Sequence, residues 1–153
     1  MPHRDFTRSA FEDKIKQYSG FLGDLVKPVP NTGGGAASAY VAGVAVSLIL
    51  KICLIECNRL QHDQEGLVFW KLLSEKCEKL AMSFFEQVSL DTEAYEAWSR
   101  ARKGLNNQLD CELAFAGVVG SPIKIMEMCV SGLLISSSAL NKCRRHLVAD
   151  IWV

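Results

Sequence analysis

The sequence predicts an all-α protein, an antiparallel bundle of about five long helices with one central helix rich in small residues. Three observations lead to this fold class. Apolar side chains recur at three- and four-residue steps along most of the 153 residues, as they do on one face of a helix. No stretch of useful length alternates polar and apolar residues in the way a strand does. The chain has only four prolines, which permits long helices.

Composition and charge narrow the class of protein further. With 49% hydrophobic residues the chain is too apolar for disorder, and its length predicts a single helical domain over residues 1–153. The 17 Lys and Arg balance 17 Asp and Glu, which argues against nucleic-acid binding because such binding needs a cationic excess. No polybasic stretch favours a lipid surface. The polar N-terminus contains no apolar signal-peptide core, so we expect a cytoplasmic location.

The six cysteines lie in apolar segments rather than in loops. Cys53 and Cys57 are four residues apart and share one helical face, but there is no Cys-x-x-Cys pair and no histidine at zinc-site spacing. Free cysteines are usually core residues. We therefore expect buried, reduced thiols and no metal site.

The first half of the chain contains two predicted helices. A helix over 8–26 places its apolar side chains on one face. Residues 27–35 hold two prolines and three glycines and predict a loop. The central helix follows over 36–60, and a polar turn over 61–66 ends it.

The second half contains four further predicted segments of helix. The first covers 66–88, and Asp91 is placed as the N-cap of the next. A short apolar helix is predicted over 109–119. Ser121 followed by Pro122 predicts the start of the last helix, with serine as its N-cap and proline at its first position, and this helix continues to the C-terminus.

An uncharged stretch over 31–50 is long enough to raise the question of a membrane span. It opens with polar and glycine residues, however, and Lys51 and Glu56 follow within the same helical pattern. It also contains a row of small residues that allows helices to approach closely: Gly35, Ala39, Gly43 and Ser47. A buried central helix is therefore favoured over a transmembrane segment at 36–55.

The sharpest local motif is the glycine triplet Gly33, Gly34 and Gly35 directly before the central helix. Glycines let backbone N–H groups converge, and a helix N-terminus adds unpaired donors and partial positive charge. A carboxylate, a phosphate or an electron-rich heterocycle could bind there. The motif matches neither a P-loop nor a dinucleotide-binding fingerprint. The alternative is that the glycines only allow tight passage between helices.

Four carboxylates are the remaining chemical candidates. Glu56 and Glu127 interrupt apolar helices, and a solvated position is favoured for each because charged residues are rarely buried without partners. Asp91 has its capping role, and Asp150 is interpreted as a surface or interface charge. A carboxylate held beside the glycine-rich backbone would make a plausible proton-transfer site.

The proline-containing approach, the glycine triplet and the uncharged helix after it resemble the signature of the cyclodeaminase/cyclohydrolase family, which includes the helical C-terminal domain of formimidoyltransferase-cyclodeaminase. The resemblance continues in order along nearly the whole chain. It is carried further by Leu90-Asp91-Thr92-Glu93-Ala94-Tyr95, by Ser121-Pro122 and by Ala149-Asp150.

The sequence also departs from the family pattern. Thr32 stands where the family has a second proline, and Ala36 replaces the usual serine after the glycines. Cys143 and Arg144 occupy the places of a Gly-Asn pair. Family members continue through at least one more helix beyond the position of Asp150, so the domain is expected to be truncated at its C-terminus.

The resemblance implies an enzyme of one-carbon metabolism, either a formimidoyltetrahydrofolate cyclodeaminase or a methenyltetrahydrofolate cyclohydrolase. A tetrahydrofolate derivative is the implied substrate, no prosthetic group is implied, and family members form dimers or larger assemblies. The implied roles are proton transfer by Asp91 and Asp150, and substrate binding by Gly33, Gly34, Gly35 and Ser38. The departures at 36 and 144 favour an alternative, a catalytically degenerate bundle kept for oligomerisation or partner binding.

Overall fold

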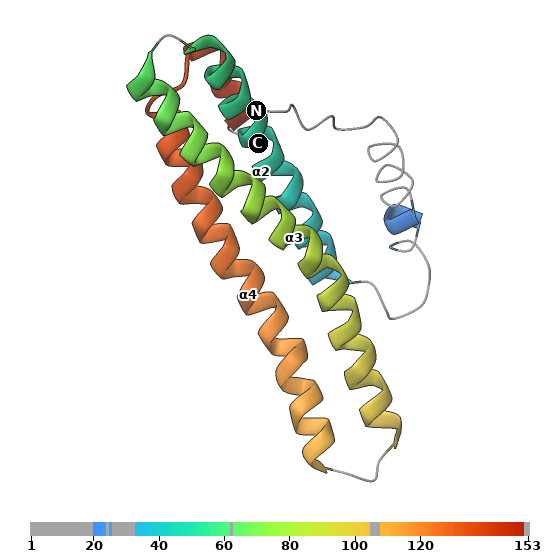
Figure 1. The fold of residues 1–153 in the computed structure, drawn as a ribbon. Helices are drawn as coiled ribbons and strands as arrows, with labels where there is room; N and C mark the ends of the chain where they lie inside the picture. The colour runs from blue at the N-terminus through green and yellow to red at the C-terminus, as the bar shows by residue number, and fades with distance from the viewer. Residues whose placement is uncertain (1–19, 24, 26–32, 62, 105–107, 152–153) are drawn as a thin grey trace, which may run out of the picture.

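A computed structural model describes residues 20–23, 25, 33–61, 63–104 and 108–151 (Figure 1). These residues form helices and turns and contain no strand, which confirms the all-α bundle. A helical turn at 20–23 precedes the main elements. The elements after it are three long helices and one 3-10 helix, namely α2 (Gly34–Arg59), α3 (Gln64–Gly104), α4 (Gln108–Leu140) and η1 (Arg145–Ile151).

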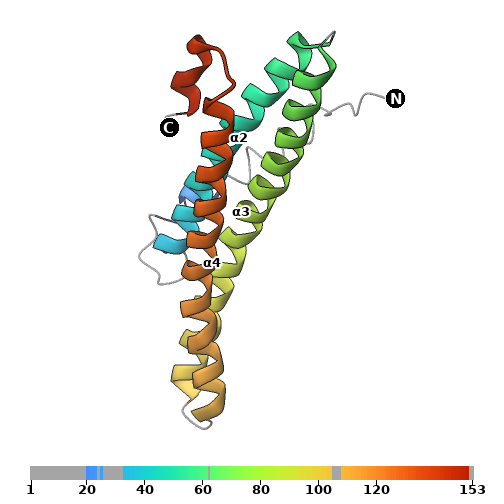
Figure 2. The ribbon, with the colours of Figure 1, turned by 90° about the vertical axis from the view of Figure 1, so that its left-hand side faces the viewer.

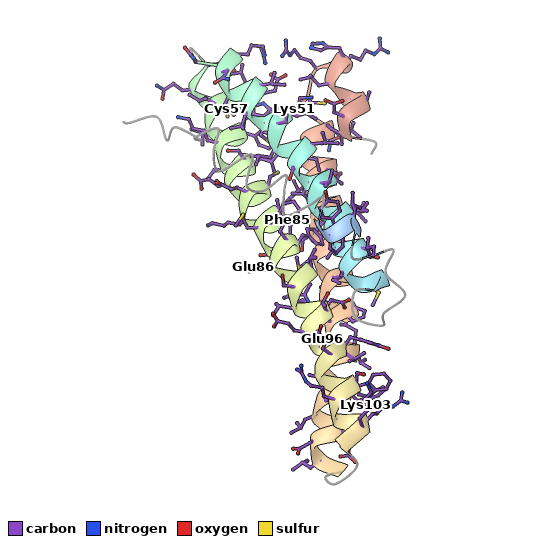
Figure 3. The ribbon with its side chains drawn as sticks, turned by 90° about the vertical axis from the view of Figure 1, so that its right-hand side faces the viewer. Lys51, Cys57, Phe85, Glu86, Glu96 and Lys103 are labelled. Carbon is purple, nitrogen blue, oxygen red and sulfur yellow. The ribbon has the colours of Figure 1, made fainter. Side chains whose placement is uncertain are left out.

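The three long helices run up, down and up beside one another (Figures 1 and 2). α3 has 41 residues and α2 has 26, and at 1.5 Å per residue they span roughly 60 Å and 40 Å. α3 and α4 therefore continue as a pair beyond the start of α2. We call this two-helix extension, residues 92–104 and 108–120, the stalk; Figure 3 shows Glu96 and Lys103 on it and Lys51 and Cys57 at the opposite end of the molecule.

The core lies where all three helices overlap. Each contributes one stripe of buried residues at three- and four-residue steps, and α2 supplies the most continuous stripe. The buried residues of α2 are Ala36, Ala39, Gly43, Val46, Ile49, Ile52, Cys53 and Glu56. The small-residue row of the sequence thus faces α3, as a buried central helix requires.

Gly43 shows why one position in that row must be small. Phe85 lies on α3 (Figure 3), and a Cβ at residue 43 would lie 2.9 Å from Cε1 of its ring. Real Cβ atoms do not come so close, so with any larger residue at 43 the Phe85 ring or the helices would have to shift. The close helix approach predicted from the sequence is confirmed here.

Two predicted helix starts are wrong. α3 continues without a break through Asp91, and α4 continues through Ser121 and Pro122. Neither side chain caps its own helix, because the Ser121 hydroxyl donates to the Asp91 carboxylate across the α3–α4 interface. Packing along that interface therefore outweighs the roughly 3 kcal/mol that an internal proline costs a helix.

The two ends of the chain also differ from the expectation or lie outside the described residues. The last helix ends at Leu140 and is followed by a turn and η1, so Asp150 lies on a 3-10 helix. Most of the predicted first helix, 8–26, lies outside the described residues. Within it, Phe21 contacts Tyr40 of α2, with ring centroids 5.1 Å apart.

By length and composition alone, two helices of the described part could cross a membrane, α2 and the Leu109–Leu140 part of α4. A core helix can pass the same test. α2 is such a helix, since its buried stripe packs against α3. A smaller share of the apolar stretch of α4 is buried than of the apolar stretch of α2.

The Gly43 contact leads to a stability prediction. Replacing a glycine inside a helix by alanine ordinarily raises stability by up to about 1 kcal/mol. We expect this gain for Gly117→Ala, whose Cβ would meet only ordinary contact. Gly43→Ala should instead lower the free energy of unfolding by about 1–2 kcal/mol because of the clash with Phe85. Urea denaturation followed by circular dichroism measures the free energy of unfolding of both variants. Equal gains for the two variants would show that the Phe85 ring accommodates a side chain at residue 43 without a cost in stability.

Candidate functional site

The carboxylate of Asp91 lies where three helices meet. Its Oδ2 accepts a hydrogen bond from the backbone N–H of Ala36 in α2 at 2.8 Å. Its Oδ1 accepts one from the hydroxyl of Ser121 in α4 at 2.7 Å. Gln87, one turn earlier on α3, donates to the Ser121 hydroxyl at 2.9 Å. We call these groups, Gln87, Asp91, Ser121 and the Ala36 amide, the Asp91 network.

The Asp91 network caps the N-terminus of α2 from a neighbouring helix. Gly33 occupies the N-cap position and has no side chain to satisfy the first-turn amides. The Asp91 carboxylate replaces the missing cap, and its negative charge is favourable at the positive end of the helix dipole. Asp91 therefore does cap a helix, as the sequence predicts, but it caps α2 and not the segment that follows it in the chain.

Only one of the three glycines is tied to this contact. A Cβ on Gly35 would lie 2.6 Å from Cγ of Asp91, so the carboxylate can reach the Ala36 amide only past a glycine. A Cβ on Gly33 or Gly34 would meet no atom of the described residues within 4 Å. The close approach of the Asp91 carboxylate thus explains Gly35, whereas no described residue fills the space beside Gly33 and Gly34 at the start of α2.

This arrangement changes the chemistry expected at the glycine triplet. The predicted cradle for an anion is already filled at the Ala36 amide by the carboxylate of Asp91. A second anion there would meet a like charge. The site instead offers a fixed hydrogen-bond acceptor, which suits a ligand that presents N–H groups or a protonated nitrogen.

The second predicted catalytic residue lies elsewhere in the chain. Asp150 on η1 forms an ion pair with Lys51 of α2, with Nζ and Oδ2 3.1 Å apart and both side chains exposed. Lys51 is fifteen residues beyond Ala36, which corresponds to about 22 Å along α2. Within one chain the structure therefore places Asp91 beside the glycine triplet, with the exposed Ser38 on the same helix end, and separates Asp150 from them.

Glu56 is a buried charged residue that the sequence interpretation placed in solvent. Its side chain is fully buried, with Oε2 2.7 Å from Nε of Arg59 and Oε1 2.7 Å from Nε of Arg144. Burial by itself raises the pKa of the Glu56 carboxyl, but the two guanidinium groups outweigh burial and hold this pKa below its ordinary value of 4.5. The solvated position of Glu127, by contrast, is confirmed, since it pairs with Lys124 on the surface at 3.8 Å.

A sequence signal for the burial of Glu56 did exist. It continues the three- and four-residue steps of the α2 stripe after Ile49, Ile52 and Cys53. The general rule that charged residues are solvated does not hold at Glu56, because its partner Arg144 is 88 residues away in the chain and cannot be identified from the local sequence.

All six cysteines are free, and Cys53 and Cys77 are fully buried. A hydrogen bond with Cys77 and burial raise the pKa of the Cys53 thiol, and burial raises the pKa of Cys57 and Cys143. Raised pKa values keep these thiols protonated and poorly nucleophilic. Among the described residues, no three His, Cys, Asp or Glu side chains are grouped so that they could hold a metal ion.

The Glu56 pair predicts a specific pH dependence of stability. Because the folded-state pKa lies below the unfolded one, the pair stabilises the fold above about pH 4.5 and loses this contribution as pH falls through the folded pKa. Glu56→Gln should lower the free energy of unfolding at neutral pH by about 2–4 kcal/mol. Between neutral pH and about pH 3 the variant should then lose less stability than the original chain.

Denaturant titrations at the two pH values measure this effect. Glu127→Gln is the matched control, because it removes an exposed carboxylate of the same type, and it should follow the original chain at both pH values. If Glu56→Gln lost as much unfolding free energy between neutral pH and about pH 3 as the original chain, the buried pair would make no pH-dependent contribution to stability.

Comparison with known proteins places the chain in a family. Residues 17–153 match the family model described as formiminotransferase-cyclodeaminase. No match was found among curated proteins or among solved structures. The matched range includes the whole Asp91 network, the glycine triplet and η1. The chain belongs to the formiminotransferase-cyclodeaminase family.

Proposed function

We propose that the chain acts on a one-carbon derivative of tetrahydrofolate, as a formimidoyltetrahydrofolate cyclodeaminase or a methenyltetrahydrofolate cyclohydrolase. Family membership supports a folate substrate. The observation that carries the proposal is the Asp91 carboxylate fixed at the open head of the glycine-rich helix. A positioned carboxylate beside open space is the group that either reaction needs for proton transfer.

In the cyclodeaminase reaction, N10 of the folate attacks the formimidoyl carbon on N5. The tetrahedral intermediate carries a proton on N10 and an amino group on the former formimidoyl carbon. Asp91 accepts the N10 proton and delivers it to the amino nitrogen, which leaves as ammonia with its bonding electrons and yields the 5,10-methenyl product. In the cyclohydrolase reaction the same carboxylate takes a proton from the water that attacks the methenyl carbon and delivers it to one of the two nitrogens. The bond from that nitrogen to the carbon then breaks with its electrons going to the nitrogen, the second water proton is released to solvent, and a formyl group remains on the other nitrogen.

The other members of the Asp91 network hold that carboxylate in place. Each oxygen of Asp91 accepts one hydrogen bond from the protein, and a carboxylate has about four acceptor positions in total. Acceptor capacity therefore remains for a substrate proton. Gln87 fixes the orientation of the Ser121 hydroxyl, so that it donates to Asp91. We propose Gln87 and Ser121 as positioning residues.

We propose that Gly33, Gly34 and the exposed Ser38 form the wall against which the folate binds. No described residue fills the space beside Gly33 and Gly34, and these glycines lie three and two residues before Ala36, whose amide donates to Asp91. We assign proton transfer to Asp91 alone, because Asp150 pairs with Lys51 far along α2. The proposal also includes a cytoplasmic location and assembly as a homodimer.

A second candidate function is an assembly module without catalysis. It is favoured by the stalk, in which no described side chain is buried, and by the exposed apolar residues of α4. Arg144, which departs from the family pattern, forms the buried pair with Glu56. This contact gives Arg144 a role in stabilising the fold rather than a role in catalysis.

Asp91→Asn tests the catalytic proposal. The amide cannot take up and deliver a proton, so we expect kcat for methenyltetrahydrofolate formation or loss to fall by about 10²–10⁴-fold. A spectrophotometric assay on the full chain measures this. Asp110→Asn, an exposed aspartate on the stalk, is the matched control and should keep full activity. If Asp91→Asn left kcat unchanged, Asp91 would have no part in the mechanism. If the original chain showed no turnover, the assembly module would be the supported function.

Gly34→Val tests the binding wall separately from the chemistry. Because no described residue lies within 4 Å of a Cβ at Gly34, the variant should fold with an unfolding free energy within about 1 kcal/mol of the original. Its side chain would occupy the space proposed for the pterin, so the Kd for 5-formyltetrahydrofolate should rise at least tenfold by calorimetry. Gly117→Val on the stalk is the control, and an unchanged Kd for Gly34→Val would place the folate elsewhere.

A further inference from the structure

The segment that follows α4 lies against the outside of the three-helix core. It comprises residues 141–151, a turn followed by η1, and we call it the strap. Figure 2 shows η1 beside the last turns of α4, at the opposite end of the molecule from the stalk. None of the strap residues is buried, so the strap is not part of the core that α2, α3 and α4 form.

The backbone of the strap is bonded only locally among the described residues. The amide of Cys143 donates to the carbonyl of Ala139, and the amide of Leu147 donates to the carbonyl of Arg144. No backbone hydrogen bond joins the described strap to α2 or α3. A segment held in this way can open locally, because its departure breaks no backbone hydrogen bond of a long helix.

Side-chain contacts hold the strap, and two of them are exposed. Asp150 pairs with the exposed Lys51 of α2 at 3.1 Å. The exposed Lys142 lies over the ring of Phe69 on α3, with Nζ 4.4 Å from the ring centroid. An exposed ion pair and an exposed cation–π contact each contribute little to stability. Partly buried apolar side chains of the strap, such as Leu147, add contact with the core.

The contact between Arg144 and Glu56 is of a different kind, because it reaches a fully buried group. Nε of Arg144 lies 2.7 Å from Oε1 of Glu56, whose side chain has no exposed surface. A charge-assisted hydrogen bond to a buried carboxylate is stronger than an exposed contact. Arg144 is therefore the main polar attachment of the strap to α2.

Glu56 has a second partner that does not belong to the strap. Arg59 lies one turn further along α2, and its Nε is 2.7 Å from Oε2 of Glu56. If the strap leaves α2, Glu56 keeps Arg59 and gains water, and the partly exposed Arg144 is solvated as well. Breaking a buried pair is costly when it leaves a buried charge without a partner. Because its two guanidinium partners are divided between α2 and the strap, Glu56 can release one of them without that cost.

We propose that the strap is a latch on the end of α2, which opens as one unit while the three long helices remain folded. The turn between Leu140 and Arg145 is its hinge, and Arg144 closes the latch by binding Glu56. The closed strap keeps Glu56 out of water and partly covers the thiol of Cys143, and the open strap exposes both. The latch lies about 30 Å along α2 from the candidate site, and it does not depend on the proposed folate chemistry.

Native-state hydrogen exchange of the full chain tests the latch without any substitution. The amides of Cys143 and Leu147 should exchange at least about a hundredfold faster than the amide of the buried Cys53 in α2. Low concentrations of urea should accelerate exchange at Cys53 and leave the strap unchanged, because opening of the strap exposes little surface. Urea acceleration of the strap equal to that at Cys53 would overturn the proposal, since the strap would then open only when the whole chain unfolds.

Two variants separate opening of the strap from unfolding of the core. Arg144→Gln should accelerate exchange at Cys143 and Leu147 by about 10–100-fold, because it removes a hydrogen bond to a charged group. Gly43→Ala should accelerate exchange at Cys53 and leave the strap amides unchanged, because it weakens the packing of α2 on α3 in the open and the closed state alike. Strap amides that Arg144→Gln leaves unaffected would contradict the role of Arg144 in the latch.

Arg145→Gln is the matched control for the first of these variants. Arg145 is an exposed arginine of the strap that forms no ion pair with a described residue, so its replacement should leave exchange in the strap as it is in the original chain. The comparison with and without urea uses the original chain, and it therefore tests the latch even if Arg144→Gln does not fold. None of these measurements involves folate, so failure of the latch and failure of the proposed function can be distinguished.

Alkylation by N-ethylmaleimide, followed by mass spectrometry of the cysteine peptides, gives an independent measure of opening. Cys143 lies on the strap, whereas Cys53 and Cys77 are fully buried in the core. Arg144→Gln should raise the alkylation rate of Cys143 at least about fivefold. By charge alone, loss of a neighbouring cation raises the pKa of a thiol and slows its alkylation, so a faster reaction reports access. An unchanged rate at Cys143, or one no faster than at Cys53, would overturn the proposal.

Discussion

The hydrogen bonds of the Asp91 carboxylate hold the three long helices in their relative positions. One oxygen fixes the start of α2 and the other fixes the level of α4 beside α3. Hydrogen bonds to a charged group contribute roughly 1.5–3 kcal/mol each, and the carboxylate also opposes the positive end of the α2 dipole. Gly35 follows from this contact, because any side chain there would displace the carboxylate.

This contact also explains which parts of the fold could be predicted from the sequence. The fold class, the central helix and the close approach at Gly43 follow from periodicity and from residue size, which are local properties. The breaks predicted at Asp91 and at Ser121-Pro122 failed, because an aspartate or serine that caps its own helix has the same sequence as one that bonds to a neighbouring helix. The Ser121 hydroxyl and the Asp91 carboxylate bond to each other instead.

The candidate site shows the same limit. The glycine triplet and Asp91 were identified separately, but their contact joins residues 55 positions apart, which no local pattern reveals. At the other end of α2, Glu56 binds Arg144, and Lys51 binds Asp150. These two pairs attach the segment around η1 to α2. The departure from the family at Arg144 therefore coincides with a contact that secures the end of the described chain.

Ser121 connects the candidate site with the exposed side of α4. Its hydroxyl reaches Asp91 only when α4 is rotated so that this face points at α3, and the same rotation turns Val119 and Ile123 outward. Within one chain, the buried stripe of α4 and the bond to Asp91 determine this rotation.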